Sequence, residues 1–180
     1  VEKNQTLLFQ SLSQAPRHLI IPFQTHGTKI LPVDEKFLGA SGQQQQEMLN
    51  GIDALITTEP GCCICISTAD CIPVLLYDRV HHAVAAVHAG GRGTVEYIVG
   101  LEKMRAVFGT EGQDVIACIG PGISLQSFEV GDEVYEAFRL NGFDMSRISF
   151  RHSVTHKYHI DLWEANRQQL LDFGVPGVQI

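Results

Sequence analysis

Four short runs of apolar and β-branched residues follow one another before the chain shows its first strong helical pattern. They occupy residues 54–57, 62–67, 72–77 and 83–87, and turns containing Pro, Gly and Asp-Arg separate them. Runs of this length between turn residues are typical of buried strands. Because the strands succeed one another rather than alternate with helices, the pattern argues against a simple doubly wound sheet. We therefore predict a layered α/β (α+β) domain.

Helical periodicity begins at the end of a glycine-rich segment. Between Thr94 and Phe108 apolar residues recur at spacings of three and four, and Gly109 follows as a helix stop. Asp161 and Glu164 form a capping-box-like start for a helix that ends at Phe173-Gly174. The other expected elements are a weak helix at 3–14, strands at 19–21 and 115–119, a helix at 132–140 and a surface insertion at 39–51.

The composition is that of a globular protein with a small ligand. A length of 180 residues fits one domain that can bury its own core. Hydrophobic residues make up 44% of the chain and charged residues 18%, unlike a disordered protein. The formal net charge of -7 argues against a nucleic-acid partner, because phosphate-backbone binding depends on clustered Lys and Arg.

The cysteines indicate a reducing compartment. Their number, five, is odd, and three lie in Cys62-Cys63-Ile64-Cys65, where neighbouring strand residues point to opposite faces. A disulfide framework is therefore not expected, which favours a cytoplasmic location. No run approaches the ~20 apolar residues of a membrane helix, and no signal-peptide pattern is present, so we expect no membrane association. Because the sequence begins with Val1 rather than Met and ends at Ile180 within an apolar run, we expect residues 1–180 to be one catalytic domain that lacks its terminal segments.

Two polar segments lie where predicted strands begin or end. Residues 68–74 place Asp70 and Cys71 between two strands, at the edge of a sheet, where functional sites are common. Residues 87–94 combine a strand end, a glycine-rich turn and a helix start, so their backbone N–H groups and Arg92 could bind an anion such as phosphate. The glycine spacing matches neither a Walker nor a dinucleotide fingerprint.

Cys71 and His88 are candidate metal ligands. They offer a thiolate and an imidazole, and His26, at a predicted strand end or in a loop, could complete a three-ligand zinc site with an open fourth position. Two other interpretations stay open. Cys71 could be a small buried residue beside a hydrogen-bonded core histidine. Alternatively, Cys71 could be a nucleophile that His88 activates without a metal.

Seven motifs resemble, in their order along the chain, the YfiH/laccase-domain family. The motifs are Gln24-Thr25-His26-Gly27, Asp53-Ala54-Leu55-Ile56-Thr57, Ala69-Asp70-Cys71-Ile72-Pro73-Val74, Val87-His88-Ala89-Gly90-Gly91-Arg92-Gly93, Ile119-Gly120-Pro121-Gly122-Ile123-Ser124, Phe128-Glu129-Val130-Gly131 and His159-Ile160-Asp161-Leu162-Trp163-Glu164-Ala165-Asn166. Together they span nearly the whole chain. The resemblance implies a four-layered α-β-β-α sandwich with mixed sheets.

The resemblance also implies a function. It indicates zinc bound by His26, Cys71 and His88, phosphorolysis of adenosine, inosine, guanosine and S-methyl-5'-thioadenosine, and deamination of adenosine. Nucleosides and phosphate are then the expected partners. We expect phosphate or substrate to contact Arg92 and a group of residues near the ligands, namely Gln24, Gly90, Gly91 and Gly93. Asp70 could orient a ligand or move a proton, and could equally be a turn cap.

Two departures from the family pattern bear on this expectation. Gly91 stands where the family usually has Trp, which affects substrate packing, and the family continues past Ile180 with a segment containing Cys and Arg. Cys62, Cys63, Cys65 and Cys118 lie in apolar runs and are interpreted as strand filler.

Other functions stay open from sequence. They are a Cys71/His88 thiol hydrolase acting on amides, an enzyme that edits peptidoglycan precursors, a copper-dependent polyphenol oxidase and a non-enzymatic metal-binding protein. Copper fits less well than zinc, because multicopper chemistry requires several His-x-His pairs that this sequence lacks. The physiological substrate, the oligomeric state and any protein partners do not follow from the sequence.

Overall fold

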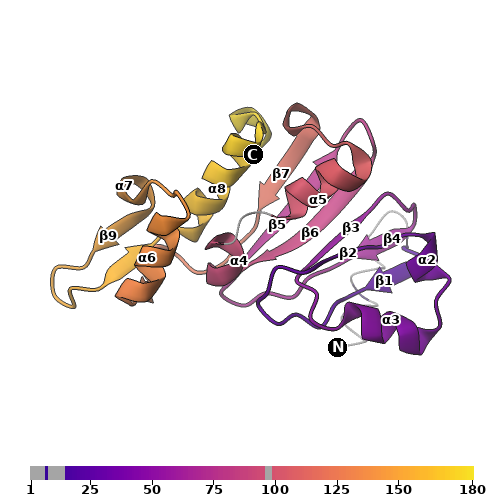
Figure 1. Ribbon diagram of the computed structural model, residues 1–180, viewed down its shortest axis with the longest axis horizontal. Helices are drawn as coiled ribbons and strands as arrows, with labels where there is room; N and C mark the ends of the chain where they lie inside the picture. Colours follow the sequence, from indigo (N-terminus) through magenta and orange to yellow (C-terminus); the bar gives the residue numbers. More distant parts are fainter. Residues whose placement is uncertain (1–6, 8–14, 96–98) are drawn as a thin grey trace.

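A five-stranded mixed sheet forms the centre of the structure (Figure 1), a computed structural model that describes Leu7 and residues 15–95 and 99–180. Its strand order is β2-β3-β6-β5-β7. The strands are β2 (Ile30–Pro32), β3 (Ala54–Thr57), β6 (Ala83–Ala89), β5 (Ile72–Asp78) and β7 (Val115–Ile119). Only the β2–β3 pair among them is parallel. The consecutive strands β5 and β6 form an antiparallel hairpin, which needs no helix between its strands.

The strand register positions the polar segments. In the β5–β6 hairpin Ile72 lies opposite Ala89 and Pro73 opposite His88, so Cys71 lies beside the end of β6. In the β3–β6 pair Ala54 lies opposite Val87, and the N–H of His88 donates to the carbonyl of Asp53 at 2.9 Å. The start of β3, the start of β5 and the end of β6 therefore lie side by side at the same end of these three neighbouring strands.

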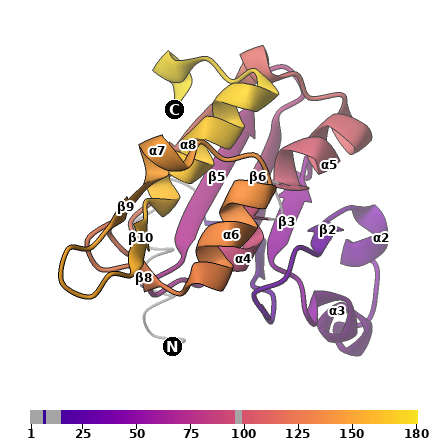
Figure 2. The ribbon, with the colours of Figure 1, turned by 60° about the vertical axis from the view of Figure 1, so that its left-hand side comes forward.

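Helices cover one face of this sheet. The helices α5 (Val99–Phe108) and α8 (Leu162–Phe173) lie on the same side of it, and the short helix α4 (Gly91–Val95) follows β6 (Figure 2). Leu101 and Met104 of α5 and Leu170 of α8 are fully buried in the main hydrophobic core. Helix α8 begins with the side chain of Asp161 capping Glu164 N–H and ends at Gly174, whose φ is 102°.

Two smaller sheets flank the central one. At one end, β1 (His18–Ile20) pairs in parallel with β4 (Cys62–Ile64) near helices α2 (Glu35–Leu38) and α3 (Gly42–Leu49). At the other end, β8 (Glu129–Val130), β10 (Tyr158–Ile160) and β9 (Ser149–Arg151) form an antiparallel sheet beside α6 (Asp132–Leu140) and α7 (Met145–Ile148). Two 3-10 helices span Gly112–Asp114 and Gly177–Gln179.

Most of the expected elements are present, with differences at their ends. The expected strand 62–67 ends as β4 at Ile64, and the strand 83–87 extends as β6 to Ala89. The expected helix 94–108 corresponds to α4 and α5, which Gly109 ends with a φ of 75°. Apart from Leu7, the expected helix 3–14 lies outside the described residues. Among the described helices, none has both the length and the apolar character needed to cross a membrane.

The segment 39–51, expected to be a surface insertion, contains helix α3. A capping box starts it: the Ser41 side chain accepts from Gln44 N–H, and the Gln44 side chain accepts from Ser41 N–H. None of the helix residues is buried. The segment thus lies on the surface as expected but has a regular structure, because Ser and Gln three residues apart satisfy the first free backbone donors.

Candidate metal centre

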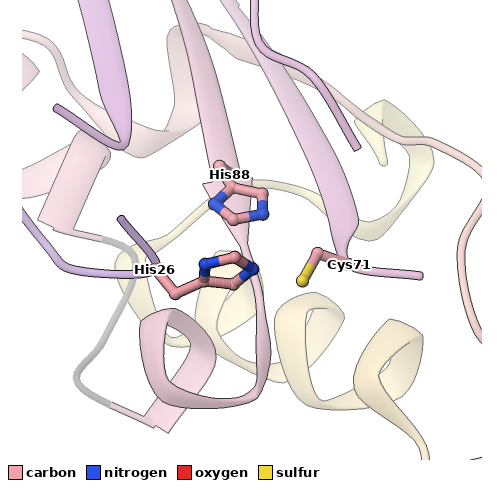
Figure 3. Close-up of side chains that lie close together, drawn as sticks. All are labelled: His26, Cys71 and His88. Atoms are coloured by element: carbon pink, nitrogen blue, oxygen red, sulfur yellow. The ribbon is translucent and has the colours of Figure 1, made fainter. Parts of the chain in front are cut away.

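His26, Cys71 and His88 lie together at one end of the inner strands of the central sheet, with their side chains pointing toward one another (Figure 3). One potential ligand atom from each residue lies within 4.8 Å of the other two. His88 belongs to β6, Cys71 directly precedes β5, and His26 lies in the loop after β1. The three residues predicted from strand-end positions are therefore neighbours in space.

The loop that carries His26 is tied to the sheet by Asp53. The Asp53 carboxylate accepts the backbone N–H groups of Thr25, His26 and Gly27, at 3.2, 2.9 and 2.8 Å. His26 itself has a φ of 58°, a left-handed conformation that is unfavourable for a residue with a side chain. Three hydrogen bonds to one buried carboxylate hold this strained turn in place.

The same carboxylate orients His88. Asp53 Oδ1 lies 2.9 Å from Nδ1 of His88, and both side chains are almost fully buried. A neutral His88 must therefore carry its proton on Nδ1, which leaves Nε2 with a free electron pair for a metal. Burial alone would raise the pKa of Asp53, but hydrogen bonds from His88 and from the amides of residues 25–27 outweigh it and lower the pKa. Asp53 thus stays ionised beside the histidine.

Glycine residues make room for the ligands. A Cβ on Gly90 would lie 2.9 Å from Cys71 Sγ and 3.8 Å from Cδ2 of His26. A Cβ on Gly93 would lie 3.1 Å from the His88 carbonyl oxygen. Gly91 has more space, since its Cβ would meet only Phe128 Cζ, at 3.4 Å. The absence of a side chain at residue 90 is therefore a condition for the thiol to occupy its place.

The surroundings of Cys71 do not favour a metal-free nucleophile. Burial raises the pKa of its thiol, and the negative charges of Asp70 and Asp53 raise it further. Activated cysteine nucleophiles have a lowered pKa because a cation or helix N-terminus stabilises the thiolate. A bound cation would supply the missing positive charge.

The ligands face an open cavity of about 550 Å³. Pro22, Phe23, Gln24, His26, Ser67, Thr68, Ala69, Asp70, Cys71 and His88 line it. Phe23 is the large apolar side chain of this lining, and 69% of it is exposed. Its backbone is fixed on both sides, because its N–H donates to Leu49 and its carbonyl accepts from Gly51. A cavity of this size is typical of small-molecule sites.

The other predicted site residues occupy different places around this cavity. The side-chain amide of Gln24 donates to the carbonyl of Ser67 at 2.9 Å and accepts from its N–H at 2.7 Å, and so joins the His26 loop to the Cys71 loop. Asp70 is exposed on the cavity lining. Arg92 lies on α4, and its side chain is outside the described part of the structure.

Sequence reasoning missed Asp53 and Phe23 as residues of the site. Asp53 is a single acidic residue directly before the apolar strand Ala54–Thr57, and this position was the available signal. The sequence does not indicate that Phe23 lines the site, because a lone aromatic residue after an apolar run is ordinarily expected in the core.

Two imidazoles and one thiolate form a borderline-soft donor set that suits zinc, and three protein ligands beside a cavity leave a further position open. This combination defines the class of mixed α/β proteins with a candidate catalytic metal site. In the part of the chain that the structure describes, His26, Cys71 and His88 are the one group of three or more His, Cys, Asp or Glu side chains whose ligand atoms lie close enough together to share a metal ion.

The chain belongs to the family described as multi-copper polyphenol oxidoreductase laccase, whose model matches residues 1–180. A purine nucleoside phosphorylase from Bacteroides thetaiotaomicron is 64% identical over 182 residues, and the match covers 100% of this chain and 67% of the relative. Adenosine deaminase RL5, from an unknown prokaryotic organism, is 42% identical, with 90% of this chain and 62% of the relative covered. The chain thus spans roughly two thirds of these relatives.

Solved structures show the same fold. The crystal structure of the Bacillus licheniformis hypothetical protein YfiH has a TM-score of 0.79 at 31% identity, covering 90% of this chain and 61% of that chain. YlmD from Geobacillus stearothermophilus has a TM-score of 0.82 at 29% identity, covering 99% and 65%. The predicted membership of the YfiH/laccase-domain family and the predicted fold class are confirmed.

Proposed function

We propose that this chain carries the zinc centre of an enzyme that processes purine nucleosides. The observation that carries the proposal is the convergence of His26, Cys71 and His88 on a cavity of about 550 Å³. Relatives named purine nucleoside phosphorylase and adenosine deaminase support the substrate class. The proposed substrates are adenosine, inosine, guanosine and S-methyl-5'-thioadenosine, with phosphate as the second substrate.

The donor set fits a zinc ion better than a multicopper centre. A multicopper oxidase needs several histidine clusters. The described residues form one candidate metal site, made by His26, Cys71 and His88. When bound, zinc would supply Lewis acidity and a water of lowered pKa. Asp53 would fix the tautomer of His88 and the position of the His26 loop.

In the proposed phosphorolysis, a phosphate oxygen bonds to C1' of the ribose while the bond from C1' to N9 breaks. The attacking hydrogen phosphate gives up one proton and the departing purine takes up one at N7, and we assign Asp70, exposed in the cavity, to relay that proton. Arg92 and the backbone N–H groups of Gly91 and Gly93 would hold the phosphate, because they lie in α4, which follows β6, the strand that carries His88. Phe23 would stack on the purine.

Adenosine deamination is a second candidate activity, supported by the relative named adenosine deaminase. In this reaction water adds to the purine ring at C6 and the amino group leaves as ammonia, so phosphate is not consumed. The Arg92→Ala variant separates the two activities. Phosphorolysis should fall roughly ten- to a hundredfold with a higher phosphate requirement, whereas deamination should change less.

Metal analysis and two product assays test the proposal. We expect about one zinc per chain by inductively coupled plasma mass spectrometry, and loss of most of it in Cys71→Ala. Free purine base should form from inosine only when phosphate is present. Stoichiometric copper without zinc would contradict the metal assignment. Full metal content with lost activity in Cys71→Ala would instead support the thiol-hydrolase interpretation.

A further inference from the structure

Two cysteine thiols outside the metal centre lie in direct contact. Cys63 Sγ and Cys65 Sγ are 3.6 Å apart, and both residues are partly buried. Cys63 belongs to β4 and pairs with Leu19 of β1, and Cys65 continues the same ladder by donating its N–H to the Ile20 carbonyl at 2.9 Å. The backbone on which both thiols stand is therefore held by the neighbouring strand.

Side chains alternate between the two faces of β4, so these two thiols do not lie on the same face as Cys62 and Ile64. Cys62 and Ile64 pack against the smaller hydrophobic cluster around Ile20 and Phe37. Successive strand residues point to opposite faces, so Cys63 and Cys65 share the other face. The interpretation of Cys62 as strand filler suits this packing, whereas Cys63 and Cys65 form a dithiol pair away from the cluster.

We propose that Cys63 and Cys65 form a thiol–disulfide exchange site that reacts with small-molecule disulfides and closes into an intramolecular disulfide. The Cys63 thiolate attacks one sulfur of the disulfide, which forms a mixed disulfide and releases the first thiolate. The Cys65 sulfur then gives up its proton and attacks Cys63 Sγ, which releases the second thiolate. The two released thiolates take up two protons, so the protein dithiol is oxidised by two electrons and the small disulfide becomes two thiols.

The two sulfurs suit different steps of this reaction. Burial raises the pKa of Cys65 to about 12, and the hydrogen bond and charge of Cys63 contribute to the rise. Cys65 therefore keeps its proton while Cys63 is a free thiolate, and donates it to that sulfur, so Cys63 is the attacking sulfur. Once Cys63 is part of the mixed disulfide, its charge and hydrogen bond no longer raise the pKa of Cys65, and Cys65 can lose its proton and resolve the mixed disulfide. Closure requires the sulfurs to approach from 3.6 Å to about 2.05 Å, a short movement.

The resulting disulfide should be easily reversed. The two cysteines are separated by a single residue, and strands hold them nearly extended, which strains a disulfide between them. Strained disulfides are the readily reduced ones. The site is independent of the proposed nucleoside chemistry, since neither thiol lines the metal cavity.

Thiol mapping by mass spectrometry tests the proposal on the reduced, intact 180-residue chain. After incubation with oxidised glutathione, acid quenching and alkylation of the unfolded chain, we expect Cys63 and Cys65 to resist alkylation and to lose about 2 Da together, without a glutathione adduct. Dithiothreitol should restore both thiols. Retention of all five free thiols, or a pairing that involves Cys62 or Cys71, would overturn the proposal.

Three variants assign the two steps. In Cys65→Ser, glutathione should remain attached to Cys63, because the resolving thiol is missing. In Cys63→Ser, the internal disulfide should be absent. Cys62→Ser is the matched control, one residue away on the opposite strand face, and should still form the Cys63–Cys65 disulfide. A stable glutathione adduct on Cys63 in the unmodified sequence would also contradict the proposal, because it would show that Cys65 does not resolve it.

Discussion

The carboxylate of Asp53 accepts hydrogen bonds from both His88, at Nδ1, and the backbone N–H of His26, each at 2.9 Å. One buried side chain thus positions two of the three candidate metal ligands, which are far apart in the sequence. Loss of such an outer hydrogen bond partner usually weakens metal binding, because the ligand ring and its tautomer are no longer fixed.

We therefore expect Asp53→Asn to lower zinc affinity by roughly ten- to a hundredfold. The asparagine side chain has one acceptor oxygen, so it cannot accept all the hydrogen bonds of the carboxylate. Competition with a chromophoric chelator measures the affinity. Asp34→Asn is the matched control, since Asp34 also accepts a backbone N–H, from Phe37, but at the start of α2. Equal zinc affinity in the two variants would show that Asp53 does not position the metal ligands.

Gly90→Ala tests the packing of the thiol. The added Cβ would lie 2.9 Å from Cys71 Sγ, closer than side-chain carbons ordinarily come, so the thiol must move. We expect zinc affinity to fall roughly tenfold or more, as for other displaced ligands. Gly42→Ala serves as the control, because a Cβ there meets nothing within 4 Å. If both alanine variants bind zinc like the parent protein, the close contact does not restrict the site.

The ligands were predictable because polar residues at strand ends stand out from the apolar strands around them. Cys71 precedes β5 and His88 lies near the end of β6, so an antiparallel pair brings them together. Their partner His26 was a candidate as a polar residue at a strand end or in a loop, and the family resemblance then indicated it as the third ligand. Its position depends on a left-handed turn held by Asp53, and no local pattern in the sequence encodes that long-range contact.

Other details of the site also depend on long-range contacts. The bonds between Gln24 and the Ser67 backbone join segments 43 residues apart, so the sequence around Gln24 gives no indication of them. The sulfur contact between Cys63 and Cys65 is different, since the strand alternation places residues two apart on one face. It was missed because apolar surroundings favoured the interpretation of both as filler.

A second buried carboxylate gives the fold a pH dependence. Asp78, at the end of β5, is fully buried and accepts from the N–H groups of Val80 and His81, at 2.8 and 3.0 Å. Its other oxygen lies 2.8 Å from Nδ1 of His81. Burial would raise the pKa of Asp78, but the nearby Thr110 hydroxyl and the hydrogen bonds from His81 and Val80 outweigh it and lower the pKa to about 2, from an ordinary 3.8.

A lowered folded-state pKa stabilises the protein above the unfolded value, and this contribution disappears as the pH falls from about 4 to about 2. At neutral pH we expect Asp78→Asn to lower the free energy of unfolding by about 2 kcal/mol. Urea unfolding at several pH values measures this difference. The gap between the two proteins should close on acidification, and a gap that stays constant down to pH ~2 would contradict a role for the ionised carboxylate.

Phe23 tests the proposed substrate class. Its side chain is 69% exposed at the cavity, while hydrogen bonds to Leu49 and Gly51 fix its backbone. Stacking of a base on an aromatic ring contributes about 1–3 kcal/mol, so Phe23→Ala should raise KM for a nucleoside roughly five- to a hundredfold. Zinc content should not change, because no ligand is altered. Phe23→Tyr should retain most of the affinity, since it keeps the aromatic face.

Isothermal titration calorimetry with adenosine provides a measurement that does not require turnover. Leu140→Ala is a suitable control, because Leu140 is also a large exposed apolar residue, at 73%, but lies on α6 and does not line the cavity. Both alanine variants remove similar exposed apolar surface, so a general effect on stability would appear in both. If Phe23→Ala binds adenosine as tightly as Leu140→Ala does, the purine does not stack on Phe23, and the base must be recognised elsewhere in the cavity.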